Sequence, residues 1–153
     1  GGKFRVLWRM QFKGADFEAQ AEEIKKITLR YNVQHIGIDT TGIGQGVYQL
    51  VKQFFPAARA YQYSVDVKTR LVLKAKSVIS KGRLEFDAGS LYLAQSFIVI
   101  KYFFICSGCQ ATYDAGRNNE TGHADLAWAC MHAMDFEPLE GASEATTSVL
   151  EFS

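Results

Sequence analysis

Residues 33–46 read VQHIGIDTTGIGQG, and this stretch decides the fold. Its first six residues, 33–38, are short and largely apolar, which predicts a strand near the centre of a sheet. Asp39 follows directly, and three glycines lie in the loop behind it, before a helical pattern begins. A strand that passes through such a loop into a helix is the unit of α/β sheets. We therefore expect an α/β domain with Asp39 at the carboxyl end of a buried strand.

The residues on either side continue the alternation of strands and helices. Predicted strands cover residues 4–12 and 60–63, residues 83–86, and a hairpin of residues 97–105 and 110–115. Apolar residues three and four positions apart predict four helices. The first lies between Asp16 and Asn32, the second follows the glycine loop and ends at Phe54, the third runs from Ser64 or Asp66 to Gly82, and the last covers residues 123–134. A helical turn is expected at residues 90–95. This order predicts a mixed sheet flanked by helices. Residues 1–138 form the expected domain, and residues 139–153 a loosely ordered tail.

Composition sets outer limits on function. The 153 residues are 48% hydrophobic and 22% charged, which is typical of one globular domain. A formal net charge of +1 neither favours nor excludes a nucleic-acid partner, so any anionic partner needs a local basic patch. No apolar run is long enough to span a membrane. Three cysteines without a signal peptide predict a reduced, intracellular protein, and Cys106 and Cys109 form a CxxC that is more typical of coincidence or a redox pair than of zinc.

Two carboxylates are candidate metal ligands. Asp39 stands at a strand end, where ligands gather in open α/β sheets, although it also suits a helix cap or a loop turn. Asp125 falls in the first turn of the last predicted helix, where the helix dipole alone favours negative charge. Together they could share Mg²⁺ or Mn²⁺ ions. His123 could contact such a metal, move a proton or orient a phosphate, or lie on plain surface, whereas His35 and His132 are expected to be structural.

The loop at residues 42–46 (GIGQG) permits a competing interpretation, a nucleotide-binding or regulatory domain. The loop follows a predicted strand and opens a predicted helix, as nucleotide-binding loops do. If the domain binds a nucleotide, Asp39 would contact its ribose or a Mg²⁺ ion. The dinucleotide fingerprint, however, needs a third glycine where Val47 stands. No GxxxxGK[ST] sequence occurs, so we expect no ATP binding through a P-loop.

One stretch is strongly basic and is a candidate for binding DNA phosphates. The helix predicted to end at Gly82 and the strand after it contain Lys68, Arg70, Lys74, Lys76, Lys81 and Arg83. Such residues supply most of the sequence-independent affinity for DNA. An ordinary solvated helix face explains the pattern equally well.

Three segments together resemble a known family, the large terminase subunit of tailed phages. They are IGIDTTGIGQGVYQLVKQFFPAA at 36–58, VKTRLVLKAKSVISKGRLEFD at 67–87 and YDAGRNNETGHADLAWACMHAM at 113–134. The resemblance is strongest to the branch that cuts concatemers at cohesive-end sites. It implies the C-terminal nuclease of RNase H-like fold, joined in such proteins to an N-terminal ATPase domain.

The resemblance also implies roles for particular residues. The family's second acidic position falls on Asp39 and its third on Asp125, with His123 close by. The implied activity is two-metal hydrolysis of concatemeric viral double-stranded DNA with Mg²⁺ or Mn²⁺, with the basic stretch on the duplex backbone. The implied partners are the terminase small subunit and the portal protein, and the implied location is the host bacterial cytoplasm.

One departure from the family pattern limits these expectations. The family's first catalytic aspartate lies on a strand upstream of the region that matches residues 1–4, and residues 4–12 contain no carboxylate. We therefore expect an RNase H-like sheet that lacks its first strand and a metal site that lacks one acid. Weak metal binding and little or no cutting by this chain follow. A module that has lost catalysis and serves as a docking surface is the remaining alternative.

Overall fold

The computed structural model describes residues 2–98, 100–105, 110–115, 125–136 and 148–152. Five helices are present in these ranges: α1 (Phe17–Arg30), α2 (Gly44–Phe54), α3 (Val65–Ser80), α4 (Leu91–Ile98) and α5 (Asp125–Asp135). The strands are β1 (Phe4–Arg5), β2 (Val33–Asp39), β3 (Arg59–Tyr61), β4 (Leu84–Glu85), β5 (Ile100–Ile105), β6 (Gln110–Ala115) and β7 (Ser148–Phe152).

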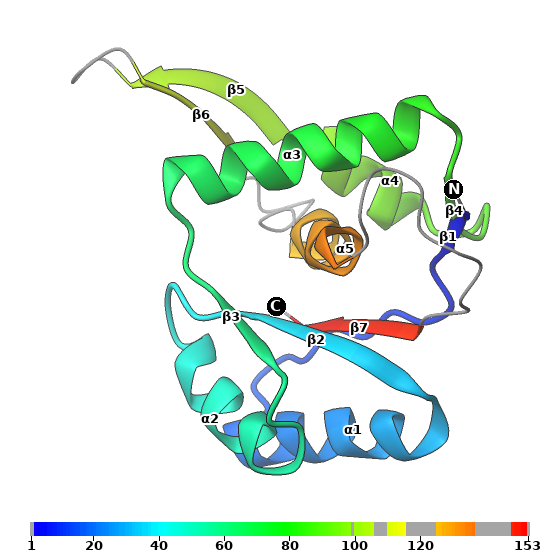
Figure 1. Cartoon of the computed structure of the whole chain (residues 1–153), viewed down its shortest axis with the longest axis vertical. Helices are drawn as coiled ribbons and strands as arrows, with labels where there is room; N and C mark the ends of the chain where they lie inside the picture. The colour runs from blue at the N-terminus through cyan, green and yellow to red at the C-terminus, as the bar shows by residue number, and fades with distance from the viewer. Residues whose placement is uncertain (1, 99, 106–109, 116–124, 137–147, 153) are drawn as a thin grey trace.

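A parallel sheet with the order β3-β2-β7 forms the middle layer of the molecule (Figure 1). Helices α1 and α2 cover one face of this sheet, and α5 covers the other. Helices α3 and α4 lie beyond α5, and the antiparallel hairpin β5–β6 extends past α3 (Figure 1). A short parallel pair, β1 and β4, completes the described strands. The predicted α/β class is therefore confirmed, with parallel and antiparallel pairings in separate sheets.

Strand β2 separates two cores because its side chains alternate between the faces of the sheet. Ile36 and Ile38 pack with residues of α1 and α2 in one buried cluster. His35 lies on the opposite face, where its ring stacks on Phe136 just beyond α5 at a centroid distance of 5.0 Å. Asp39 is four residues after His35, so its side chain lies on the same face of β2 as that of His35, toward the layer that contains α5.

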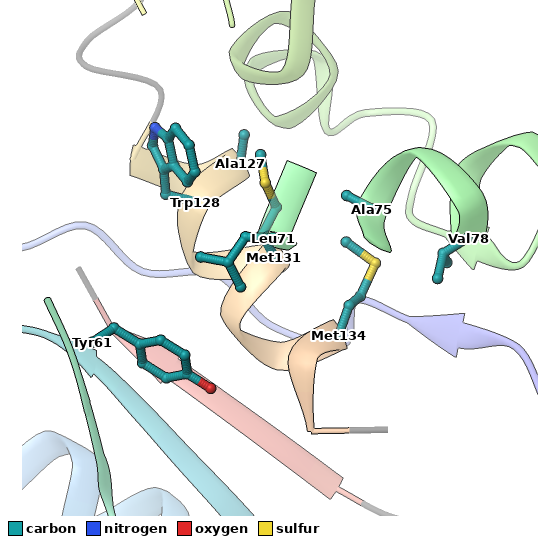
Figure 2. Close-up of a cluster of buried hydrophobic side chains, with 8 residues drawn as sticks. All are labelled: Tyr61, Leu71, Ala75, Val78, Ala127, Trp128, Met131 and Met134. Carbon is teal, nitrogen blue, oxygen red and sulfur yellow. The ribbon is translucent and has the colours of Figure 1, made fainter. Parts of the chain in front are cut away.

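The second core surrounds α5. Its buried members are Tyr61, Leu71, Ala75, Val78, Ala127, Trp128, Met131 and Met134. Figure 2 shows side chains of α3 and α5 meeting, with Tyr61 approaching from the sheet. This packing fixes α5 between the sheet and α3, and it therefore sets where the first turn of α5 lies.

Local capping explains where two of the helices begin. The Asp16 carboxylate accepts a 2.7 Å hydrogen bond from the backbone N–H of Ala19, and the Ser64 hydroxyl accepts one of 3.2 Å from that of Val67. Both residues were predicted caps, and side-chain oxygens in this position satisfy N–H groups that the helix leaves unpaired. Gly82, with φ of 63°, follows α3 as predicted.

Several predicted boundaries were wrong. The strand expected over residues 4–12 is only Phe4–Arg5, because its partner β4 has two residues and the chain beyond Val6 makes no further ladder. Phe97 belongs to α4 rather than to the hairpin. Strand β7 falls within residues 139–153, where a loosely ordered tail was expected, and pairs with β2. The turn of the hairpin, with Cys106 and Cys109, lies outside the described residues.

Candidate functional site

Asp39 is the last residue of β2, and the loop behind it is tied to β3. Its Oδ1 accepts a 2.8 Å hydrogen bond from the backbone N–H of Thr41. The backbone N–H of Thr40 donates to the carbonyl oxygen of Tyr61 at 2.9 Å. The hydroxyl oxygen of Thr41 in turn accepts from the backbone N–H of Tyr63 at 2.9 Å. These bonds hold the Asp39 carboxylate at the carboxyl end of the sheet.

Two of the three glycines of the loop, Gly44 and Gly46, have packing roles. A Cβ on Gly44 would overlap the carbonyl oxygen of Asp39, and a Cβ on Gly46 would meet the ring of Phe17 at 2.5 Å. Gly44 therefore lets α2 start directly behind Asp39, and Gly46 lets α1 and α2 approach closely. This explains the glycine pattern without a bound phosphate.

Asp125 is the first residue of α5 and is exposed. Residues 125, 128 and 132 lie three and seven positions apart, so Asp125, Trp128 and His132 share one side of the helix. Trp128 and His132 are both buried, and both contact Tyr63. The side of α5 that begins at Asp125 therefore runs along Tyr63.

Tyr63, two residues beyond the end of β3, connects the two candidate acids. Its hydroxyl lies 2.8 Å from Nε2 of His132, and its ring centroid lies 5.2 Å from that of Trp128. Burial raises the pKa of the Tyr63 phenol, and the negative charges of Asp39 and Asp125 raise it further. Both carboxylates thus lie close enough to raise the pKa of one phenol, in agreement with the contacts of Tyr63 to the loop behind Asp39 and to the side of α5 that begins at Asp125. His123 lies outside the described residues.

The two described histidines are buried, in agreement with the structural role expected for them. Burial lowers the pKa of His132 to about 4, against the opposing effects of Asp39 and Asp135. Burial, and then the charge of Arg59, lower the pKa of His35 to about 4. The His132 ring stacks on Tyr61 with a centroid distance of 4.3 Å. Both imidazoles are therefore neutral at pH 7.

The basic residues of α3 fall into two groups. Arg70 and Lys74 face Asp135 at the end of α5: Arg70 Nη2 lies 3.0 Å from its Oδ2, and Lys74 Nζ donates to its carbonyl oxygen at 2.7 Å. The Asp135 side chain is only 7% exposed, and it also accepts a hydrogen bond from the Tyr61 hydroxyl at 3.2 Å. These two cations therefore balance a buried carboxylate of the protein itself.

The remaining predicted DNA-binding residues lie elsewhere. Lys68 Nζ lies 5.9 Å from the ring centroid of Tyr63, and Lys76 is exposed on α3. Arg83 follows α3, and its guanidinium lies 5.3 Å from the ring centroid of Phe4. Of these residues, Lys68 is the one placed beside Tyr63.

Sequence reasoning missed Tyr63 and Asp135. A tyrosine after a short strand has no chemical signature, and its partner His132 is 69 positions away. The spacing of Tyr61 and Tyr63 offered one signal. Residues two apart in an extended segment point to the same face, and both tyrosines contact His132 of α5.

The donor set fits a hard divalent cation, because carboxylate oxygens are the ligands that Mg²⁺ and Mn²⁺ prefer. Among the residues that the structure describes, no three His, Cys, Asp or Glu side chains gather into one cluster. Asp39 and Asp125 stay the two predicted metal ligands within the described residues. In the same residues, no helix is both long and apolar enough to cross a membrane.

Comparison with known proteins identifies the family of the chain. The family model of the terminase RNaseH-like domain matches residues 1–136. The chain belongs to this family. The predicted family and the RNase H-like fold are thereby confirmed.

Two curated relatives extend this result. The chain is 52% identical to the terminase ATPase subunit of Escherichia phage P2 over 99% of its own length, and 39% identical to the probable terminase ATPase subunit of Haemophilus phage HP1 over 91%. It spans only 26% and 23% of those two proteins. The terminase domain thus corresponds to about a quarter of each relative.

Solved structures of a terminase nuclease share the fold. Crystal structures of the large terminase nuclease from the thermophilic phage G20c, one with bound magnesium and one with bound cobalt, both superpose with a TM-score of 0.65. Sequence identity is 19% and 17%, over 80% and 81% of this chain and 62% and 64% of theirs. At this identity the likeness establishes the fold.

Proposed function

We propose that this terminase domain is a metal-dependent endonuclease that hydrolyses double-stranded viral DNA during packaging. The observation that carries the proposal is the position of Tyr63 between the elements of the two acids, which are 86 positions apart in the sequence. The backbone N–H of Tyr63 donates to Thr41 in the loop behind Asp39, and its ring contacts Trp128 and His132 on the side of α5 that begins at Asp125. In isolation each acid has a structural explanation, as a loop anchor or as a charge at a helix start. Two acids at one end of a sheet, in a family named for RNase H, favour a shared metal site.

In this proposal Asp39 and Asp125 hold Mg²⁺ or Mn²⁺. Two such ions, when bound, activate a water and stabilise the leaving oxygen of a phosphodiester. The hydrogen bond from the N–H of Thr41 orients the Asp39 carboxylate, and the first turn of α5 presents Asp125. The presence of magnesium and cobalt in the G20c nuclease supports a divalent ion.

Lys68 is the first proposed DNA contact, because its ammonium lies over the ring of Tyr63. A lysine in this position neutralises a phosphate of the duplex near the site of cutting. The N-terminal ATPase domain, the terminase small subunit and the portal protein are the partners that this function requires. The names of the phage P2 and HP1 relatives support the first of them.

Plasmid cleavage tests the proposal in a full-length terminase that contains this domain. Asp39→Asn and Asp125→Asn should each abolish the Mn²⁺-dependent conversion of supercoiled plasmid to linear DNA, while circular dichroism shows an intact fold. Asp66→Asn is the matched control, since Asp66 is also an exposed acid in the first turn of a helix, and it should leave cleavage unchanged. Full activity in either site variant would remove that residue from the metal site.

Thermal unfolding separates this proposal from a nucleotide-binding domain. Mn²⁺ should raise the melting temperature of the 153-residue chain, and Asp39→Asn should remove that rise. ATP or NAD should leave the melting temperature unchanged, because the packing of Gly44 and Gly46 accounts for the glycine loop. A rise with nucleotide and none with Mn²⁺ would favour the alternative.

A further inference from the structure

Tyr63 lies where three elements meet beside the proposed metal site. Its backbone N–H donates to the Thr41 hydroxyl in the loop behind Asp39. Its ring contacts Trp128 and His132 of α5, and the Lys68 ammonium of α3 lies over the same ring. Displacement of Tyr63 would therefore disturb the Asp39 loop and α5 together.

The contact between Tyr63 and His132 restrains the rotation of α5. The apolar contacts of this helix are not directional and would by themselves let it turn about its axis by small amounts, so its directional restraints are the bonds of His132 and of Asp135. The hydrogen bond between the Tyr63 hydroxyl and His132 Nε2, 2.8 Å apart, is directional and lies in a mostly buried setting. His132 is seven positions after Asp125, two turns along the same side of α5. Fixing His132 therefore fixes the direction in which Asp125 points.

We propose that Tyr63 is a positioning residue for the metal site: its hydroxyl, paired with His132, holds α5 in the rotation that turns Asp125 toward Asp39. This inference rests on the proposed function, since it assumes that the two acids share a metal. Tyr63 itself is not a metal ligand in this account. Its effect is to set the separation of the two carboxylates before a metal arrives.

The chain offers a matched control for this role. Tyr61, the last residue of β3, precedes Tyr63 by two residues, stacks on the same His132 ring and is buried. Its hydroxyl donates to Asp135 at the far end of α5 rather than to His132. Tyr61→Phe and Tyr63→Phe thus remove equivalent atoms, but Tyr61→Phe removes the bond to Asp135, whereas Tyr63→Phe removes the bond to His132, two turns after Asp125 on the same side of α5.

The test measures Mn²⁺ affinity of the 153-residue chain, from the electron paramagnetic resonance signal of free Mn²⁺ at a temperature well below unfolding. Tyr63→Phe should raise the dissociation constant about tenfold, the lower end of the effect expected for residues that orient metal ligands. Tyr61→Phe should leave it unchanged although the melting temperature falls. His132→Phe should match Tyr63→Phe, and the double variant should show no additional loss, because both remove one interaction.

The outcomes distinguish the positioning role of Tyr63 from the proposed metal site on which it depends. Equal Mn²⁺ binding by the unmodified chain and by Asp39→Asn would overturn the metal site and the role of Tyr63 with it. Loss of binding in Asp39→Asn but wild-type affinity in Tyr63→Phe would overturn the positioning role alone. An equal loss in Tyr61→Phe, or additive losses in Tyr63→Phe and His132→Phe, would also overturn it, because general loosening of α5 would then explain the data.

Discussion

The carbonyl oxygen of Asp39 occupies the space that a side chain on Gly44 would need. Helix α2 begins at Gly44, so its first turn lies against the end of β2. Val47 and Val51 then reach the core formed with α1. The position of the Asp39 backbone is thus determined by helix packing on one side and by β3 on the other.

Gly44→Ala should destabilise the chain by about 2 kcal/mol or more, because backbone on both sides must shift to admit a methyl group. Gly42→Ala is the control, since a Cβ there meets nothing within 4 Å. It should change the free energy of unfolding by less than about 0.5 kcal/mol. Urea unfolding measures both values. Equal stability of the two variants would show that α2 can move away from Asp39 without loss.

Asp135→Asn should cost about 3 kcal/mol, because it removes the charge that balances the mostly buried Lys74 ammonium. The comparison is Glu85→Gln, which breaks the exposed ion pair with Lys3 and should cost less than about 1 kcal/mol. Chemical denaturation of both variants gives the difference directly. A small effect at Asp135 would mean that Arg70 and Lys74 do not depend on it.

Stability should fall as the pH drops from about 6.5 toward 4. The folded chain lowers the pKa values of His35 and His132 to about 4, so in this interval the unfolded chain binds more protons than the folded one. The contribution is complete above pH 6.5 and is lost as the pH falls toward 4. Urea midpoints at pH 7, 6, 5 and 4 measure it, and His132→Phe should reduce the slope. A midpoint that is constant from pH 7 to 5 would contradict the burial of both rings.

Lys68 and Lys74 should differ in their effects on DNA binding. Lys68→Ala should weaken binding to a duplex and reduce the slope of log affinity against log salt by about one, as loss of one phosphate contact does. Lys74→Ala should lower stability with little change in that slope, because Asp135 already engages its ammonium. Fluorescence anisotropy over a salt series measures both. Equal slopes for the two variants would show that the bond of Lys74 to Asp135 does not distinguish it from Lys68 in DNA binding.

The parts of the fold that local sequence determines were predictable. The apolar run before Asp39 predicted β2, and the oxygen-bearing residues Asp16 and Ser64 predicted two helix starts. In each case the residue that marks the start or the end of the element lies next to the residues that form it. The two candidate acids could be identified for the same reason, because each stands at such a boundary.

Features that depend on distant pairing were not predictable. Residues 6–12 have the composition of a strand, but the two-residue partner β4 limits the ladder. β7 pairs with β2 across more than a hundred positions, behind a stretch whose composition indicated a loose tail. The approach of Tyr63 to His132, and the burial of Asp135 between Arg70 and Lys74, arise only when α5 is packed between the sheet and α3.

The most direct test of the central claim is anomalous diffraction from crystals of the chain soaked in Mn²⁺ at a concentration high enough to fill a weak site. The account predicts a manganese peak in contact with carboxylate oxygens of both Asp39 and Asp125, absent from crystals of Asp39→Asn. Manganese bound only elsewhere, or the two carboxylates more than about 7 Å apart and therefore unable to share a two-ion site, would contradict it.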